Sequence, residues 1–245
     1  AAALTIGLAL VSMAAVVSDS LKATIGKTLD TSISADLFIS SEGGFGPPTG
    51  FSSDLVVDLS IAAEENPQLI DSAVSYRFAF SGMTVADDYK DVASTDLSLL
   101  SRHMDIDLAE GSIDAQAPEG SDGTLLLHSD PAETNNFSVG DQISVKFGGT
   151  REANLTIAGI YHNATLLGNW VVDNSTFDKY LPQTQDFFLS ILYSPSTNAD
   201  EALGLVTSLT DEYPQLAVES QREYRESIEA QLDQVLTIIT VFLGL

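Results

Sequence analysis

The sequence predicts an α+β domain, a mixed sheet with packed helices, set between two flanking helices. Short runs of β-branched and aromatic residues, bounded by Gly, Pro, Asn or Asp, recur through the middle of the chain and are typical of strands. Two stretches among them, 54–65 and 199–212, carry the apolar spacing of amphipathic helices. The segments 1–17 and 235–245 contain no charged side chain. The pattern therefore indicates a folded domain between two apolar helices.

The N-terminal segment reads as a helix that continues into the domain. Leu21, Ile25, Leu29 and Ile33 recur every four residues, which predicts an amphipathic stalk after the apolar segment. Seventeen helical residues rise roughly 25 Å, a little less than the ~30 Å hydrocarbon core of a bilayer. We expect residues 1–17 to be the end of a transmembrane helix. A signal-peptide remnant is the alternative, but it leaves the second apolar segment unexplained.

The C-terminal segment mirrors the first one. Tyr224, Ile228 and Leu232 begin an apolar stripe that Leu236 and Ile239 continue, and polar residues fill the opposite face. We expect residues 18–233 to form an extracytoplasmic domain that includes both stalks, and residues 234–245 to begin a second transmembrane helix. The two helices should then leave the domain side by side from the same pole. Two ordinary terminal helices of a soluble domain are the alternative.

The elements between the stalks follow from local patterns. A strand is expected at 35–39, a helix at 54–65 capped by Ser52 or Ser53, and a strand or hairpin at 69–86 broken near 81–82. Residues 87–123 are polar and poorly periodic, with at most short strands near 95–100 and 105–108. The remaining expected strands are 124–128, 142–147, 154–161, 169–172, 187–193 and 215–218, and the remaining helices are 174–180 and 199–212.

Composition excludes several classes of function. The chain has 35 acidic and 10 basic residues, a net charge of −25, which disfavours contact with nucleic acid. The acidic residues are scattered, as on the solvated surface of a folded domain. There is no cysteine, so disulfides and thiolate metal sites are excluded.

The histidines offer little chemistry. His128, Ser129 and Asp130 are the residue types of a hydrolytic triad, but a triad requires side chains that converge from separate elements. A strand end followed by a capped turn explains them better. His103, His128 and His162 lack the spacing of metal ligands.

Two further segments suggest ligand binding only weakly. The carboxylates of 87–91 and 105–107 lack the ligand pattern of a calcium loop. The glycine-rich segment 43–46 is followed by Pro47 and Pro48, where a phosphate-binding helix would have to begin. Phe45 and Phe51 flank these prolines and either form an exposed contact loop with them or fold back onto the domain. We predict no catalytic, cofactor or metal site.

Several segments in order resemble the FtsX/MacB-type permeases of ABC transporters. They are 3–12 (ALTIGLALVS), 18–25 (SDSLKATI), 29–39 (LDTSISADLFI), 137–141 (FSVGD), 155–161 (LTIAGIY), 166–168 (LLG), 212–214 (EYP) and 223–226 (EYRE). The chain looks most like the second half of the tandem permeases of actinobacteria. The resemblance implies a MacB-like extracytoplasmic core domain without chemistry of its own. Residues 81–123 match it only loosely.

The resemblance also implies partners and a mechanical role. ATP would be hydrolysed on a separate cytoplasmic ATP-binding subunit, because this chain has no Gly-x-x-x-x-Gly-Lys-Ser/Thr loop. The domain would lie on the extracytoplasmic side of the cell membrane. There it would couple the motion of that subunit to a substrate or partner outside. Its neighbours would be the membrane and the other extracytoplasmic domain of the same or a paired permease. The alternatives are a membrane-anchored binding or sensor module without an ATPase, and a hydrolase that uses His128 or His162.

Overall fold

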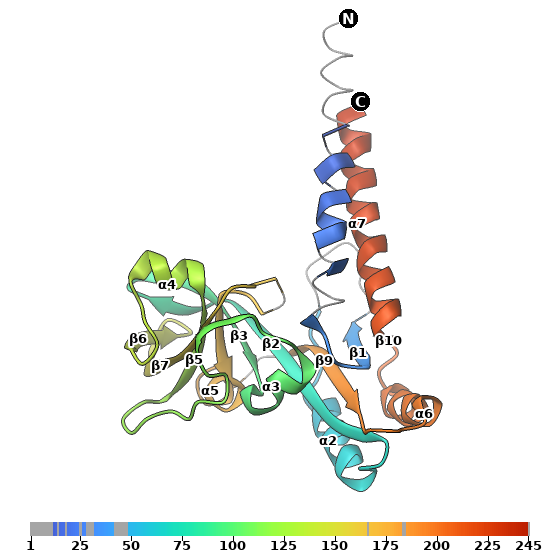
Figure 1. Ribbon diagram of the computed structural model, residues 1–245, viewed down its shortest axis with the longest axis horizontal. Coiled ribbons are helices and arrows are strands. Elements are labelled where there is room, and N and C mark those ends of the chain that lie inside the picture. Colours follow the sequence, from blue (N-terminus) through green and yellow to red (C-terminus); the bar gives the residue numbers. More distant parts are fainter. Residues whose placement is uncertain are drawn as a thin grey trace, which may run out of the picture.

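The computed structural model describes residues 12–13, 15–17, 19–24, 26–27, 32–41, 49–165, 167–182 and 185–244; at 236, 239, 240 and 242–244 it describes the backbone. The expected mixed α+β sheet with packed helices is confirmed. The rest of the chain forms two lobes that lie at one end of a pair of helices (Figure 1).

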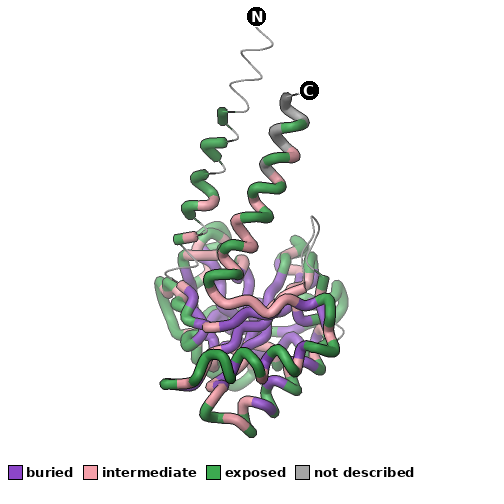
Figure 2. The backbone as a smooth tube through the Cα atoms, turned by 90° about the vertical axis from the view of Figure 1, so that its right-hand side faces the viewer, coloured by how far each residue is buried: buried purple, intermediate pink, exposed green. Residues whose placement is uncertain are grey.

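The flanking segments are both helical where they are described. The described residues between 12 and 27 are helical and belong to the first segment, and α7 (Gln221–Gly244) is the second. The two helices run side by side from the same end of the body (Figures 1 and 2). Among the described residues, no helix combines the length and apolarity that a membrane crossing requires.

The lobe nearest the helices is a split βαβ arrangement. β1 (Leu37–Ser41), α2 (Asp54–Glu65) and β2 (Ile70–Val85) make its first half, and β9 (Asp186–Tyr193), α6 (Ala199–Thr210) and β10 (Leu216–Ser220) make its second. Its strands lie in the order β10-β1-β9-β2, and each neighbouring pair is antiparallel. We call this the βαβ lobe.

α2 and α6 cover one face of that sheet, at the end of the molecule away from the flanking helices (Figure 1). Leu55 and Leu59 of α2 and Val206 of α6 are fully buried against Ile39 and Ile191 of the strands. Leu55 and Leu59 are one helical turn apart, so both side chains lie on the face of α2 that contacts the sheet. This spacing makes α2 an amphipathic helix.

The second lobe is inserted between β2 and β9 and contains a closed barrel. Its strands are the distal part of β2 together with β3 (Asp88–Thr95), β8 (Trp170–Asp173), β5 (Gly123–His128), β7 (Arg151–Tyr161) and β6 (Gln142–Phe147). They pair in that order, and β6 closes the ring by pairing with β2 through Met83–Val85. A short strand, β4 (Leu108–Gly111), extends the sheet at β7. We call this the barrel lobe.

β2 belongs to both lobes because it is sixteen residues long and irregular in the middle. Its pairing with β3 shifts between Ala79 and Met83, and Ser81 has a φ of 51°. The Asp91 carboxylate accepts a hydrogen bond of 2.7 Å from the Ser81 N–H and satisfies a backbone donor freed by the bulge. A bulge bends a strand. At the expected break near 81–82 the bulge changes the direction of β2, which passes there from the βαβ lobe into the barrel lobe.

Short helices correct two of the sequence expectations. The expected strand near 95–100 is instead the end of β3 followed by α3 (Leu97–His103), because the Asp96 side chain caps Ser98 N–H at 2.9 Å. The capped turn expected after residue 128 is a helix, α4 (Ser129–Asn135). α5 (Asn174–Tyr180) lies where a helix was expected.

Candidate functional site

The face of the βαβ sheet opposite α2 and α6 is where the flanking helices meet the rest of the protein. Strand alternation places Phe38 of β1, Tyr76 of β2 and Phe188 of β9 on this face. The pairing of Phe38 with Ser190, and of Tyr76 with Phe188, brings these side chains together across three strands.

The base of α7 packs onto this face. The Tyr224 ring lies 4.9 Å from the Phe38 ring and 5.3 Å from the Phe188 ring, centroid to centroid. Ile228, one turn later, joins the same cluster, whose buried members are Ile33, Ala35 and Phe38. Burial, together with the nearby Glu219 carboxylate, raises the pKa of the Tyr224 hydroxyl to about 12. α7 is thus anchored to the sheet by an aromatic side chain in its first turn.

α3 of the barrel lobe packs onto the same face. Its last residue, His103, is 1% exposed and lies between two serine hydroxyls, with Nε2 2.9 Å from Ser72 Oγ and Nδ1 2.8 Å from Ser190 Oγ. Tyr76 Oη lies 3.3 Å from the same Ser190 hydroxyl. Burial is the main cause that lowers the pKa of His103 to about 4, so the ring is neutral at pH 7.

The chain that follows the first flanking helix touches both neighbours. Ser34 N–H donates to the His103 carbonyl at 3.0 Å, and Asp105 N–H donates to the Ser32 carbonyl at 2.7 Å. Gln221 of α7 donates through Nε2 to the Ile33 carbonyl at 3.1 Å. Both flanking segments and α3 therefore converge at one place.

Phe188 connects the two sides of this place. Its ring lies 5.3 Å from Phe38, 5.3 Å from Tyr224 and 5.4 Å from Tyr76. It packs against the cluster below α7 and also against the cluster that includes Leu97 and Leu100 of α3. We call Ile33, Phe38, Tyr76, His103, Phe188 and Tyr224 the helix–sheet junction.

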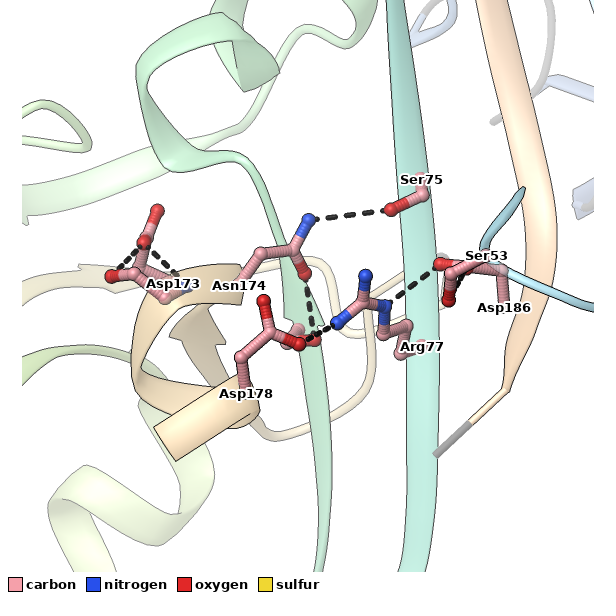
Figure 3. A network of polar contacts seen from close by, with 9 residues as sticks. Ser53, Ser75, Arg77, Asp173, Asn174, Asp178 and Asp186 are labelled. Carbon is pink, nitrogen blue, oxygen red and sulfur yellow. Dashed lines mark hydrogen bonds and ion pairs between the residues drawn. The ribbon is translucent and has the colours of Figure 1, made fainter. Parts of the chain in front are cut away.

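A polar network joins the lobes on the other side of β2 (Figure 3). The buried Arg77 donates from Nε to Asp186 of β9 at 2.8 Å and also forms an ion pair with Asp178 of α5. Ser53, which precedes α2, donates to the other Asp186 oxygen at 2.5 Å. Desolvation opposes the charge of Arg77, but the two carboxylates outweigh it and raise the pKa of the guanidinium. We call these residues the interlobe network.

Asn174 adds a neutral connection beside the ion pairs. Its side chain accepts from Ser94 of β3 at 2.8 Å and donates to Ser75 of β2 at 3.3 Å (Figure 3). α5 therefore holds β2 by charge through Asp178 and by one hydrogen bond through Asn174, which also binds β3.

The stalk residues singled out from the sequence are distributed unevenly. Tyr224 belongs to the helix–sheet junction, Ile228 packs against the same cluster, and Leu232 is half-buried on the same stripe. Leu21 is 44% exposed, whereas its neighbour Lys22 forms an ion pair with Asp233 of α7. Ile25 and Leu29 lie outside the described residues.

The expected contact loop is described only at its end. Phe45, Pro47 and Pro48 lie outside the described residues. Phe51 is 3% exposed, packs in the core beneath α2, and exchanges backbone hydrogen bonds of 2.8 and 3.2 Å with Asp186. For Phe51, the structure corresponds to the second alternative, a segment that folds back onto the domain.

The triad-type residues do not form a triad. His128 caps α4, accepting from Asp130 N–H through Nδ1 at 3.3 Å, and its Nε2 donates to the His162 carbonyl at 3.0 Å. Both ring nitrogens of His128 are therefore used by backbone groups. The described part of the chain contains no group of three His, Cys, Asp or Glu side chains arranged to hold a metal ion.

The residues that sequence analysis missed are Arg77, His103, Phe188 and Asp186. Each lies in or next to a strand or helix that the pattern located, but its partners come from distant parts of the chain. Arg77 is the one charged residue of 72–86, inside the expected strand or hairpin, and this lone charge was the available signal for the interlobe network.

The fold and the junction define a class of protein: an α+β domain held at one pole by two helices. The chain matches the family model described as the MacB-like periplasmic core domain over residues 1–223. It therefore belongs to that family, which is found in the permeases of ABC transporters on the extracytoplasmic side.

One solved structure supports the fold. The periplasmic region of MacB from Actinobacillus actinomycetemcomitans is 13% identical with a TM-score of 0.60, covering 82% of this chain and 95% of that one. The extracellular domain of the noncanonic ABC-type transporter YknZ from Gram-positive bacteria is 12% identical with a TM-score of 0.48, covering 77% and 100%. A comparison with proteins of curated function found no match.

Proposed function

We propose that this domain is a mechanical relay in an ABC transporter permease. Hydrolysis of ATP by a separate cytoplasmic subunit would move the two flanking helices, and the domain would pass that motion to a substrate or partner outside the membrane. The family supports the setting, and the helix–sheet junction supports the mechanism.

One observation carries the proposal. Phe188 packs against Tyr224 of α7 on one side and against Tyr76, which shares the α3 cluster, on the other. A tilt of α7 therefore presses on the same sheet face that seats the barrel lobe. Packed side chains transmit displacement because a close-packed interior yields little.

The remaining parts of the expected setting belong to the same proposal. Residues 1–17 and 234–245 would be portions of transmembrane helices, and the chain would be the second such domain of a tandem permease. A second extracytoplasmic domain would then stand beside it. A membrane-anchored binding module without an ATPase is the competing function.

The test is an insertion of two glycines after Leu232 in the full permease with its ATP-binding subunit. Each glycine costs a helix interior about 1 kcal/mol, and the insertion rotates the apolar stripe by ~200°. We expect ATP hydrolysis to persist while extracytoplasmic activity is lost.

A control insertion of two glycines after Glu119 lies in an exposed loop of the barrel lobe and should leave both activities intact. If the insertion after Leu232 also leaves both at normal levels, the domain is not a relay.

A further inference from the structure

Among the described residues of this acidic protein, the basic side chain of Arg151 has no acidic partner. Eight basic residues have a carboxylate oxygen within 4 Å: Lys22, Arg77, Lys90, Arg102, Lys146, Lys179, Arg222 and Arg225. Arg151 has none among the described residues, although the chain carries 35 acidic residues.

Arg151 lies at an open end of the barrel. It starts β7 directly opposite Phe147, the last residue of β6, and the two are joined by the turn of Gly148 and Gly149, with φ values of 55° and 78°. Residues paired across two strands point to the same side of the sheet, and Phe147 is fully buried in the barrel core. The guanidinium therefore stands at the rim of the barrel mouth.

The guanidinium is held in position without being neutralised. Its Nη1 donates to the Tyr180 carbonyl at the end of α5, at 2.8 Å. A carbonyl uses one of the five N–H donors of Arg and leaves the positive charge uncompensated. Asp122 accepts from Asn154 N–H at 3.0 Å and from Lys179 at 2.9 Å, and these two bonds lower its pKa to about 2.

Beside this charge is an open hollow whose surface is partly polar and partly apolar. A cavity of about 450 Å³ is lined by Arg151, Phe147, Tyr180, Leu181 and Pro182 together with turn residues. The Tyr180 ring, which is 8% exposed, stacks at 5.1 Å on the fully buried Phe147 ring. Ligand sites of this size, apolar with one or two oriented polar groups, occur in the mouths of barrels.

We propose that this barrel mouth binds a small organic anion, a carboxylate attached to an aromatic or aliphatic body. The carboxylate would accept hydrogen bonds from Arg151, and the body would lie against Tyr180, Leu181 and Pro182. Arg binds carboxylates through paired N–H groups. The protein has a net charge of −25, yet Arg151 is not paired with a described carboxylate of the chain, so its N–H donors are available to a ligand. The site is separate from the helix–sheet junction and does not depend on the relay function.

The test is an amide chemical-shift titration of the 245-residue chain with 3-phenylpropanoate, and with its neutral analogue 3-phenylpropanamide. We expect saturable shifts at Gly148, Gly149 and Leu181 with the carboxylate, and roughly tenfold weaker binding of the amide. Arg151→Gln, which removes the positive charge, should also weaken binding of the carboxylate roughly tenfold. Arg222→Gln, at an exposed ion pair on α7, should not change it.

Equal affinity for the carboxylate and the amide overturns the proposal, as does unchanged affinity in Arg151→Gln or the absence of saturable shifts. If Arg151→Gln fails to fold, the comparison of carboxylate with amide on the unaltered chain decides. If Arg151 only stabilises the end of α5, the protein should bind the carboxylate no more tightly than the amide.

Discussion

At the scale of the residue, the interlobe network depends on the guanidinium of Arg77, which pairs with two carboxylates of very different exposure. The Asp186 side chain is fully buried, whereas that of Asp178 is 62% exposed. A buried ion pair costs desolvation on both sides, and breaking it leaves an uncompensated charge inside the protein. The two carboxylates should therefore contribute unequally.

Asp186→Asn should lower the free energy of unfolding by about 3 kcal/mol, because the buried Arg77 loses its buried counter-charge. Asp178→Asn is the matched control and should cost less than about 1 kcal/mol, since the exposed pair is screened by solvent. Urea unfolding of both variants measures the difference. Similar losses in the two variants would show that burial does not decide the strength of this network.

His103 makes stability depend on pH in a defined direction. Its pKa is about 4 in the folded protein and near 6.5 when unfolded, so the unfolded chain binds the extra proton first. The contribution of the neutral His103 ring to the free energy of unfolding is fully present above about pH 6.5. It falls as the pH drops toward 4, by about 3 kcal/mol in all.

His103→Gln should remove that part of the pH dependence, as followed by urea unfolding between pH 4 and 7. His162→Gln, at an exposed position, is the control and should retain it. A slope that survives in His103→Gln would mean that carboxylates alone produce it.

At the scale of the element, local sequence was enough to locate most strands and helices. α2 and α5 have the bounds expected for them, because Pro67 follows α2 and Asp173 caps α5 with a hydrogen bond to Ser175 N–H of 2.9 Å. α3 and α4 were missed and α5, of the same length, was found, because seven residues show too little periodicity for the pattern alone to decide between a helix, a strand and a turn.

α7 offers a test of how a terminal element is anchored. Tyr224→Ala should reduce the free energy of unfolding by about 3 kcal/mol, since the ring fills space between Phe38 and Phe188. Tyr224→Phe keeps the ring and should cost less than about 1 kcal/mol. Chemical unfolding of the two variants separates ring packing from the hydroxyl. Equal losses would place the anchoring in the hydroxyl and not in the aromatic cluster.

At the scale of the whole molecule, the closed barrel and the split βαβ order could not be read from the sequence. Closure depends on three residues of β2, Met83–Val85, pairing with β6 sixty residues later. Periodicity identifies each strand but contains no information about its partner. The helix–sheet junction was predictable only on its α7 side, through the stripe of Tyr224 and Ile228, because α3 reaches the same face from within the insertion.

The insertion nevertheless begins and ends at one point, which allows the two lobes to be separated. Arg77 of β2 pairs with Asp186 of β9, so residues 78–185 can be replaced by Asn-Gly, a turn that joins antiparallel strands. That replacement removes the barrel lobe and α3 while keeping α2, α6 and α7. The face occupied by α3, including Val74 and Tyr76, then becomes exposed to water.

The shortened chain should therefore lack a cooperative thermal transition and should bind a hydrophobic dye. Burial of one large apolar side chain contributes about 1.5–3 kcal/mol, and several are lost against a total stability of about 5–15 kcal/mol. Replacing Val74 and Tyr76 by Thr in the shortened chain, which keeps β propensity and removes the apolar surface, should reduce dye binding. Differential scanning calorimetry with dye fluorescence measures both effects. A shortened chain that unfolds cooperatively without these substitutions would show that the βαβ lobe is autonomous, and α3 would then not couple the barrel to the flanking helices.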